Sequence, residues 1–193
     1  MVRGRPPSTS ARELEVIALR LFAEQGFDDT SVEQIASAAG ISRRTFFRYF
    51  DSKTDVLWHN FDHEVAELRA ALEAADAQSP VLKAIREGVL AVNRYTAADV
   101  PELRTRMNLI NSSPALAASA AVHYDAWEQA IIDFAAARMH TNPKALRPVA
   151  VGRATLAVCR AAYEQWAVRA DASLSHYLDQ ALRLLVDGFG TLS

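Results

Sequence analysis

The chain has 193 residues, half of them hydrophobic and 23% charged, and its 21 basic and 23 acidic residues leave a formal net charge of −2. This composition excludes an intrinsically disordered chain and a uniform polycation, and the length allows a sizeable buried core. The single cysteine, Cys159, excludes an internal disulfide, and the longest uncharged run, residues 107–124, is too polar to span a membrane, so we expect a cytoplasmic protein.

The chain opens with a predicted basic arm and a first helix. Residues 1–9 contain Arg3 and Arg5 and too few apolar side chains to fold by themselves, so we expect a flexible arm. A helix then begins at about Ser10, carries an apolar stripe along one face, and ends at Gly26.

A second and a third helix follow at short intervals. The sequence T-S-V-E predicts a capping box in which Thr30 and Glu33 start the second helix. Gly40 ends that helix, and Ser42 caps the third after a turn of two residues. Two helices joined this tightly predict a helix-turn-helix.

The rest of the chain predicts further helices and no strand. A fourth helix opens at Asp51 or Ser52 and extends to about Ala77, and proline marks the start of most later ones. These later helices are expected at 80–96, 101–111, 114–139, 148–170 and 173–188. The predicted fold is therefore all-α with about nine helices, divided into the arm at 1–9, a helix-turn-helix domain at 10–57 and a second domain at 58–193.

The third helix sorts its side chains onto two faces. Phe46 and Phe50 share one side, where they can pack on the preceding helices. Arg43 and Phe47 flank this ridge, and the opposite face carries Arg44, Thr45, Arg48 and Tyr49. Such a face suits the major groove of DNA, because arginine pairs with guanine while hydroxyls contact phosphates.

Positive charge is concentrated in the same part of the chain. Residues 40–53 contain three arginines and Lys53 against Asp51 alone, a local charge of +3, and residues 1–12 contain three arginines and no acid. This distribution is typical of a protein that contacts nucleic acid with one small region. The alternative is a solvated basic helix face on an all-α small-molecule binding protein or enzyme.

Residues 11–57 resemble the DNA-binding domain of the TetR family of transcriptional regulators, through "LEVIALRLFAEQGFDDTSVEQIASAAGISRRTFFRYFDSKTDVL". The resemblance implies that the third helix reads bases through Arg43, Arg44 and Thr45, while Tyr49 and Lys53 hold the DNA backbone. The arm would enter the minor groove or contact phosphate. The complete set of predicted DNA-binding residues is Arg3, Arg5, Thr30, Arg43, Arg44, Thr45, Phe47, Arg48, Tyr49 and Lys53.

Three positions depart from the family pattern. Arg44 stands where a small residue is common, which suggests a guanine contact. Phe47 replaces the usual tyrosine and cannot make a phosphate hydrogen bond. Tyr49 replaces a common histidine and would have to make its contact through a longer side chain.

The similarity continues beyond residue 57. The segments "RTRMNLINSSPAL", "YDAWEQAI" and "AAYEQW" resemble TetR-type regulators associated with mycofactocin gene clusters. The family implies a homodimer that binds a palindromic operator, usually as a repressor, and is released by a small apolar or acyl-type effector such as an acyl-CoA. We expect effector contacts from Arg104, Met107, Asn108, Tyr124, Trp127, Tyr163 and Trp166, although aromatic and methionine side chains at helical spacing are also typical of a core.

The last two helices are expected to form the dimer interface. The final helix has a wide apolar surface, and the one before it is rich in small residues that permit close packing. The predicted interface residues are Ala154, Leu174, Leu178, Leu182 and Leu185. The alternative is a buried helix pair within a monomer.

Other chemistry is weakly supported. His59 and His63 are spaced to share a helix face but have no third metal ligand in the pattern, so no metal is predicted. Cys159 lies among small apolar residues and is expected in the core. The usual nucleotide-binding and nucleophile motifs of enzymes are absent from the sequence, and no cofactor is predicted.

Overall fold

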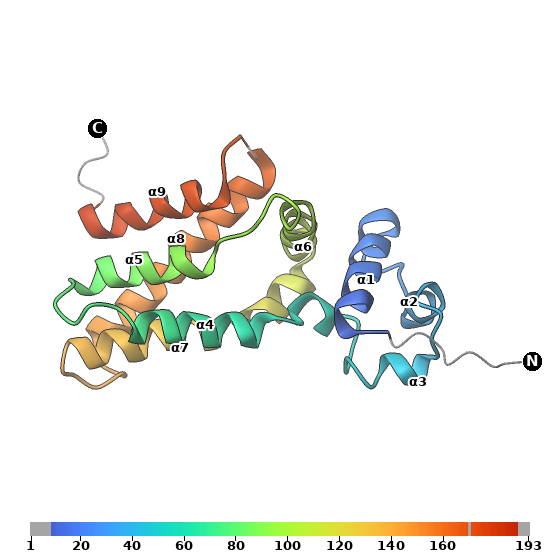
Figure 1. The fold of residues 1–193 in the computed structure, drawn as a ribbon, viewed down its shortest axis with the longest axis horizontal. Coiled ribbons are helices and arrows are strands. Elements are labelled where there is room, and N and C mark those ends of the chain that lie inside the picture. The colour runs from blue at the N-terminus through green and yellow to red at the C-terminus, as the bar shows by residue number, and fades with distance from the viewer. Residues whose placement is uncertain (1–8, 170, 189–193) are drawn as a thin grey trace, which may run out of the picture. The chain divides into compact units, whose positions relative to one another are not determined.

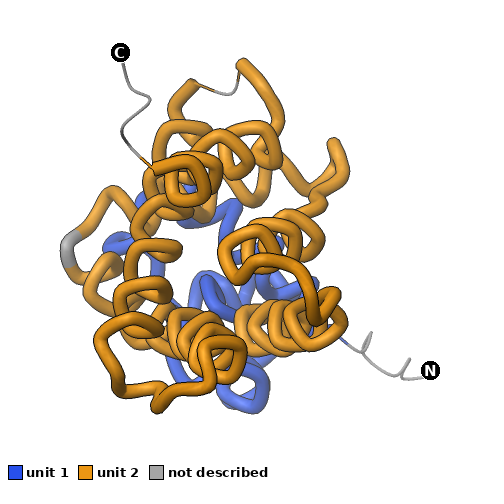
Figure 2. The backbone as a smooth tube through the Cα atoms, turned by 90° about the vertical axis from the view of Figure 1, so that its left-hand side faces the viewer, with its two compact units in different colours: residues 1–59 blue, residues 60–193 orange. Residues whose placement is uncertain are grey.

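The computed structural model describes residues 9–169 and 171–188 of the chain. The chain forms two compact units, residues 1–59 and residues 60–193, drawn in different colours in Figure 2. The boundary falls between His59 and Asn60, two residues later than the sequence analysis placed it. All secondary structure in the described residues is helical, which confirms the all-α prediction (Figure 1).

From Thr9 onward, where the structure describes it, the first unit contains three α-helices and one 3-10 helix. These are α1 (Ala11–Gln25), α2 (Val32–Ala38), α3 (Arg43–Phe46) and η1 (Asp55–Trp58). The helix α1 begins with reciprocal hydrogen bonds between Ser10 and Glu13, and Gly26 ends it with a φ of 93° that favours glycine. The core of the unit comes from all four helices and includes Leu14, Phe22, Ile35, Phe46 and Val56.

The start of α2 differs from the predicted capping box by one residue. Ser31, not Thr30, caps the helix, and its partner is Gln34 instead of Glu33. Thr30 is completely buried and donates its hydroxyl hydrogen to the carbonyl oxygen of Gly26 at 2.7 Å. The prediction failed because both threonine and serine can cap a helix, and only the tertiary packing selects between neighbours.

The turn between α2 and α3 agrees with the sequence analysis. Gly40 has a φ of 66°, and the Ile41 amide donates to the Ala36 carbonyl at 2.9 Å. The hydroxyl of Ser42 then accepts from the Thr45 amide at 3.1 Å. The buried side chain of Phe46 faces the core, and Phe50, after the helix, is also buried.

The predicted fourth helix is wrong as a continuous element. The segment consists of η1 and, in the second unit, α4 (Phe61–Glu73), with His59 and Asn60 between them. Ser52 and Asp55 close the turn before η1 through reciprocal hydrogen bonds of 2.8 and 3.3 Å. The three consecutive buried residues that follow, 56–58, do not fit the periodicity of a helix with one apolar face.

The described residues of the second unit form a bundle of six helices. Besides α4 it contains α5 (Val81–Val92), α6 (Val100–Ser112), α7 (Pro114–Arg138), α8 (Leu146–Arg169) and α9 (Leu174–Asp187). The most extensive contacts join α7 to α8 and α8 to α9, and α4 packs against both α5 and α7 (Figure 1). In the described part of the chain, none of the helices combines the length and the apolar character needed to cross a bilayer.

At Gly152, α8 lies close against α7. A Cβ atom there would lie 2.4 Å from Cγ1 of Ile132 and 3.2 Å from the Glu128 carbonyl oxygen. Since neither the helix backbone nor a β-branched side chain can yield easily, we expect Gly152→Ala to lower the free energy of unfolding by about 1–3 kcal/mol.

Chemical denaturation of both variants measures this effect, with Gly88→Ala as the matched control. A Cβ at Gly88 would lie 3.0 Å from a Leu72 methyl group at the end of a flexible side chain, so its cost is smaller. Equal costs for the two variants would show that the contact between α7 and α8 is not specially tight.

Candidate nucleic-acid interface and effector region

Two arginines are available to a ligand, Arg44 in α3 and Arg48 in the turn that follows it. The helix α3 ends at Phe46, earlier than the sequence predicted. Arg44 and Arg48 are exposed, and neither has a hydrogen bond or an ion pair with any residue that the structure describes. The Arg48 guanidinium lies 5.9 Å from the centre of the Tyr49 ring. Thr45 is half-buried, with its hydroxyl 2.9 Å from that of Ser42.

Arg43 is held in place by residues on two sides. Its Nε lies 3.1 Å from a carboxylate oxygen of Glu33 in α2. Its guanidinium also lies 5.3 Å from the centre of the Phe47 ring, which is 40% exposed. Glu33 and Phe47 therefore restrict the conformation of the Arg43 side chain. Arg44 and Arg48, in contrast, form no ion pair with a described residue.

Lys53, which was predicted to contact phosphate, binds backbone carbonyl oxygens within the protein. Its ammonium group donates to the carbonyl oxygens of Phe27, Asp28 and Thr30 at 2.6, 3.3 and 3.0 Å, and it lies 4.4 Å from the Phe27 ring. All three N–H bonds of the ammonium have acceptors within the protein. Lys53 therefore stabilises the loop between α1 and α2.

The surface near the start of α2 also differs from the prediction. The Thr30 hydroxyl is buried and donates to the Gly26 carbonyl oxygen, so the structure offers no exposed hydroxyl there, and the contact of this side chain with DNA stays a prediction. The exposed hydroxyl at this helix start belongs to Ser31. The T-S pair in the sequence was the signal that could have pointed to it.

Tyr49 connects α3 to the base of the N-terminal arm. Its phenol donates a hydrogen bond to the carbonyl oxygen of Thr9, directly before α1. The predicted arm residues Arg3 and Arg5 lie outside the described part of the chain. Thr9 is thus attached to the turn that follows α3.

We expect Tyr49→Phe to loosen this attachment. Loss of the hydrogen bond, about 0.5–1.5 kcal/mol, would speed amide hydrogen exchange at the start of α1 roughly threefold to tenfold. Exchange measured by mass spectrometry checks this, with Tyr124→Phe in the second unit as control. Unchanged exchange around Thr9 would show that the bond does not hold the arm.

The residues predicted to bind an effector differ widely in exposure. Trp166 is 1% exposed and belongs to the hydrophobic core, while Asn108 is exposed. The guanidinium of Arg104 donates to the Ala167 carbonyl oxygen at 3.2 and 2.9 Å. The others are half-buried at the edge of the bundle core or beside it: Met107, Tyr124, Trp127 and Tyr163.

A polar cluster lies where the C-terminal end of α5 contacts α8. Tyr163 donates its phenol hydrogen to the side-chain oxygen of Asn93, which ends α5 and is 7% exposed. Asn93 also donates to the Val89 carbonyl at 2.8 Å. Burial, and then the charge of Glu64, raises the pKa of Tyr95 to about 12, and burial raises the pKa of Tyr163 as well. Both phenols are therefore neutral hydrogen-bond donors at physiological pH.

The sequence analysis did not find this cluster. Asn93 and Tyr95 fall at and just after the end of a helix, where the apolar periodicity that guided the prediction stops. Arg106 and Glu102 form an ion pair of 3.3 Å nearby in sequence, with side chains only 12% and 22% exposed. A buried polar pair of this kind gives little signal in the sequence alone.

Three of the predicted dimer residues belong to the core of the protomer itself. Leu174, Leu178 and Leu182 are at most 4% exposed and pack in the hydrophobic cluster of the bundle, which leaves little of their surface for a second protomer; their place at a dimer interface stays a prediction. Ala154 and Leu185 are half-buried. The exposed face of α8 carries a different set of small and apolar residues at helical spacing: Leu146, Ala150, Ala157, Ala161 and Val168.

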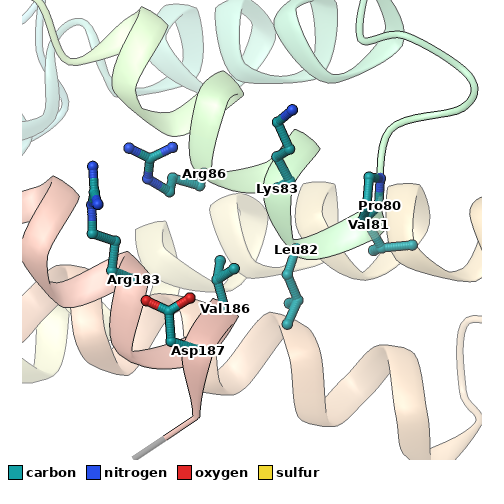
Figure 3. A pocket seen from close by; sticks show the side chains of 8 residues that line it. All are labelled: Pro80, Val81, Leu82, Lys83, Arg86, Arg183, Val186 and Asp187. Carbon is teal, nitrogen blue, oxygen red and sulfur yellow. The ribbon is translucent and has the colours of Figure 1, made fainter. Parts of the chain in front are cut away.

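A groove of about 490 Å³ lies between α5 and α9 (Figure 3). Lys83, Arg86 and Arg183 border it, but Arg86 and Arg183 both hydrogen bond to Asp179, and Lys83 lies 3.9 Å from Glu87. The groove therefore carries little excess charge. It includes no residue of the predicted effector set.

The remaining candidates from the sequence are the histidines, as metal ligands, and the thiol of Cys159. The residues described include no cluster of three or more side chains suited to hold a metal ion. His63 lies 3.5 Å from Glu67 on the surface of α4. Cys159 is buried, as expected, and burial raises the pKa of its thiol to about 12, so it stays protonated at neutral pH.

Comparison with known proteins defines the class. Residues 17–58 match the family described as bacterial regulatory proteins, tetR family, and residues 79–190 match the MftR C-terminal domain. A Mycobacterium tuberculosis protein named as the mycofactocin biosynthesis transcriptional regulator MftR is 34% identical over 190 residues, which cover 98% of this chain and 96% of that protein. The regulator TcmR of Streptomyces glaucescens is 31% identical over 164 residues, covering 81% and 73% of the two chains.

Solved structures share the fold. The fatty acid degradation regulator FadR from Bacillus halodurans aligns with a TM-score of 0.70 and 18% identity, covering 93% of this chain and 99% of that one. FadR from Thermus thermophilus, a repressor solved with lauroyl-CoA, aligns with a TM-score of 0.58 and 24% identity over 93% and 94%. The chain belongs to the tetR family of bacterial regulatory proteins, with a C-terminal domain of the MftR type. It is thus a DNA-binding transcriptional regulator, and the alternative of an enzyme is set aside.

Proposed function

We propose that the protein is a repressor that binds a palindromic operator as a homodimer and leaves it when a small apolar or acyl-type effector binds. The observation that carries DNA binding is the exposed pair Arg44, in α3, and Arg48, in the turn after it, neither of them in an ion pair with a described residue. Guanidinium groups free of internal partners can pair with guanine and phosphate without breaking protein contacts.

The exposed stripe on α8 supports dimerisation. Small and apolar side chains recur along it from Leu146 to Val168, and a second copy of the same stripe could pack closely against it. Placing a charge in its centre by Ala157→Glu would then give monomers in sedimentation experiments and abolish operator binding. Gln180→Glu, at an exposed position of α9, is the control for added negative charge.

The effector class draws support from the second unit and a relative. The structurally similar regulator from T. thermophilus was solved with lauroyl-CoA. In this chain an apolar bundle core adjoins two half-buried neutral donors, Tyr95 and Tyr163, a combination that suits a ligand with an apolar body and polar groups. The effector shifts the population of the dimer toward a form that cannot place both α3 helices in adjacent major grooves.

Fluorescence anisotropy on the DNA upstream of the gene, with and without lauroyl-CoA, tests the proposal. We expect tight binding to one palindromic segment, a steep dependence on salt, and release by the acyl-CoA. Transcription in vitro from the same DNA then distinguishes repression from activation. Weak binding that is equal on all duplexes would contradict operator recognition, and specific binding unaffected by acyl-CoA would contradict the effector class.

A further inference from the structure

Phe47 presents a large apolar ring on a helix surface that is otherwise polar. The residue is 40% exposed, beside the exposed Arg44 and Arg48. A single exposed apolar side chain is ordinary in itself. The position of this ring, however, is controlled by its neighbours, and the surface around it is the one proposed to face DNA bases.

Two contacts fix the ring. It meets the Phe46 ring edge to face, with centroids 5.5 Å apart and planes at 90°, and Phe46 is completely buried and packs on Phe50. On its other side lies the guanidinium of Arg43, 5.3 Å from the ring centre. Because Phe46 and Arg43 already restrict the Phe47 ring, its side chain loses little conformational entropy when it contacts a ligand.

A contact with Glu33 also restricts the orientation of the Arg43 side chain. Glu33 binds its Nε at 3.1 Å, and its terminal N–H groups have no acceptor among the described residues. A guanidinium group that packs on an aromatic ring can still donate hydrogen bonds to a guanine in the plane of the guanidinium. The aromatic ring can at the same time contact an apolar group of the neighbouring base. In the major groove the apolar group of this kind is the C5-methyl of thymine.

We propose that Phe47 recognises the C5-methyl group of one thymine in each operator half-site, next to a base pair read by an arginine of the same helix. The inference rests on the proposed operator binding and deepens it. Phe47 lacks the hydroxyl that would bind a phosphate, so its contribution is to sequence selection. Glu33 and Phe46 are positioning residues for this contact.

The experiment uses the full chain and duplexes selected from a random library. In the selected operator each thymine is replaced in turn by uracil, which removes the methyl group alone. We expect one thymine per half-site at which the replacement weakens binding roughly fourfold, the effect of one buried methyl group. Phe47→Ala should bind the thymine and uracil duplexes equally at that position.

Two further variants keep the test decisive. Phe47→Leu retains an apolar side chain and should retain part of the sensitivity, and thermal unfolding shows whether either variant is destabilised. Arg44→Ala should bind more weakly yet keep the full difference between thymine and uracil.

The failures are distinguishable. If no operator is selected, operator binding itself is wrong. If an operator is selected and Phe47→Ala removes the sensitivity to uracil at none of its positions, the proposed thymine contact is wrong. Operator binding by the protein is then still supported.

Discussion

Arg44→Ala is expected to lower operator affinity by about 1–3 kcal/mol for each half-site, the usual value of a bidentate arginine–guanine pair. The loss should be concentrated on the specific operator, because Arg44 is exposed, has no ion pair with a described residue, and lies on the face of α3 opposite the buried ridge of Phe46 and Phe50. Competition with operators altered at single base pairs should show relaxed preference at one position per half-site.

Anisotropy titrations over a range of salt concentrations measure this effect. Arg94→Ala is the matched control, because it removes the same charge from an exposed position in the second unit. The control should leave operator specificity unchanged. An equal weakening on operator and random DNA would instead assign Arg44 to phosphate binding, since phosphate contacts act almost uniformly across sequences.

Trp166→Ala is expected to lower the free energy of unfolding by about 3–5 kcal/mol, as is typical when a large buried aromatic is truncated. Trp166 is 1% exposed and packs within the cluster that contains Leu68, Ile85 and Leu178. The truncation leaves a cavity where α8 meets its neighbours, and the surrounding helices can close it only in part.

Urea denaturation followed by circular dichroism measures the change without relying on tryptophan fluorescence. Val122→Ala, at a site on α7 that is 72% exposed and lies outside the stripe proposed for the dimer, should change stability by no more than about 0.5 kcal/mol. If Trp166→Ala were as stable as the unsubstituted protein and had lost only its response to an effector, the residue would belong to the effector site as the sequence analysis expected.

The helix-turn-helix was predictable because its determinants are local. Gly40 permits a positive φ, Ser42 caps the next helix, and the alternation of arginine with Phe46 and Phe50 defines two faces within one short element. Each of these effects acts over a few residues. The family resemblance through residue 57 then turned a helix pair into a specific functional prediction, which the matched families confirm at the level of the class.

The roles of individual side chains were less predictable. Lys53 was assigned to phosphate from its place in the family pattern, yet its ammonium group binds carbonyl oxygens more than 20 residues earlier in the chain. Leu178 and Leu182 belong to an apolar stripe that would suit a dimer interface equally well. A stripe shows that one face must be buried, but it does not identify the surface that buries it.

The sequence by itself therefore determined the all-α class, the turn that joins α2 to α3, and the arginine-bearing face of α3, because capping, glycine conformation and helical periodicity are properties of neighbouring residues. The tertiary structure alone decided that Thr30 is buried, that Tyr49 holds Thr9, and that Asn93 meets Tyr163 across 70 positions of sequence. These contacts depend on which helices pack together, and packing is a property of the whole fold.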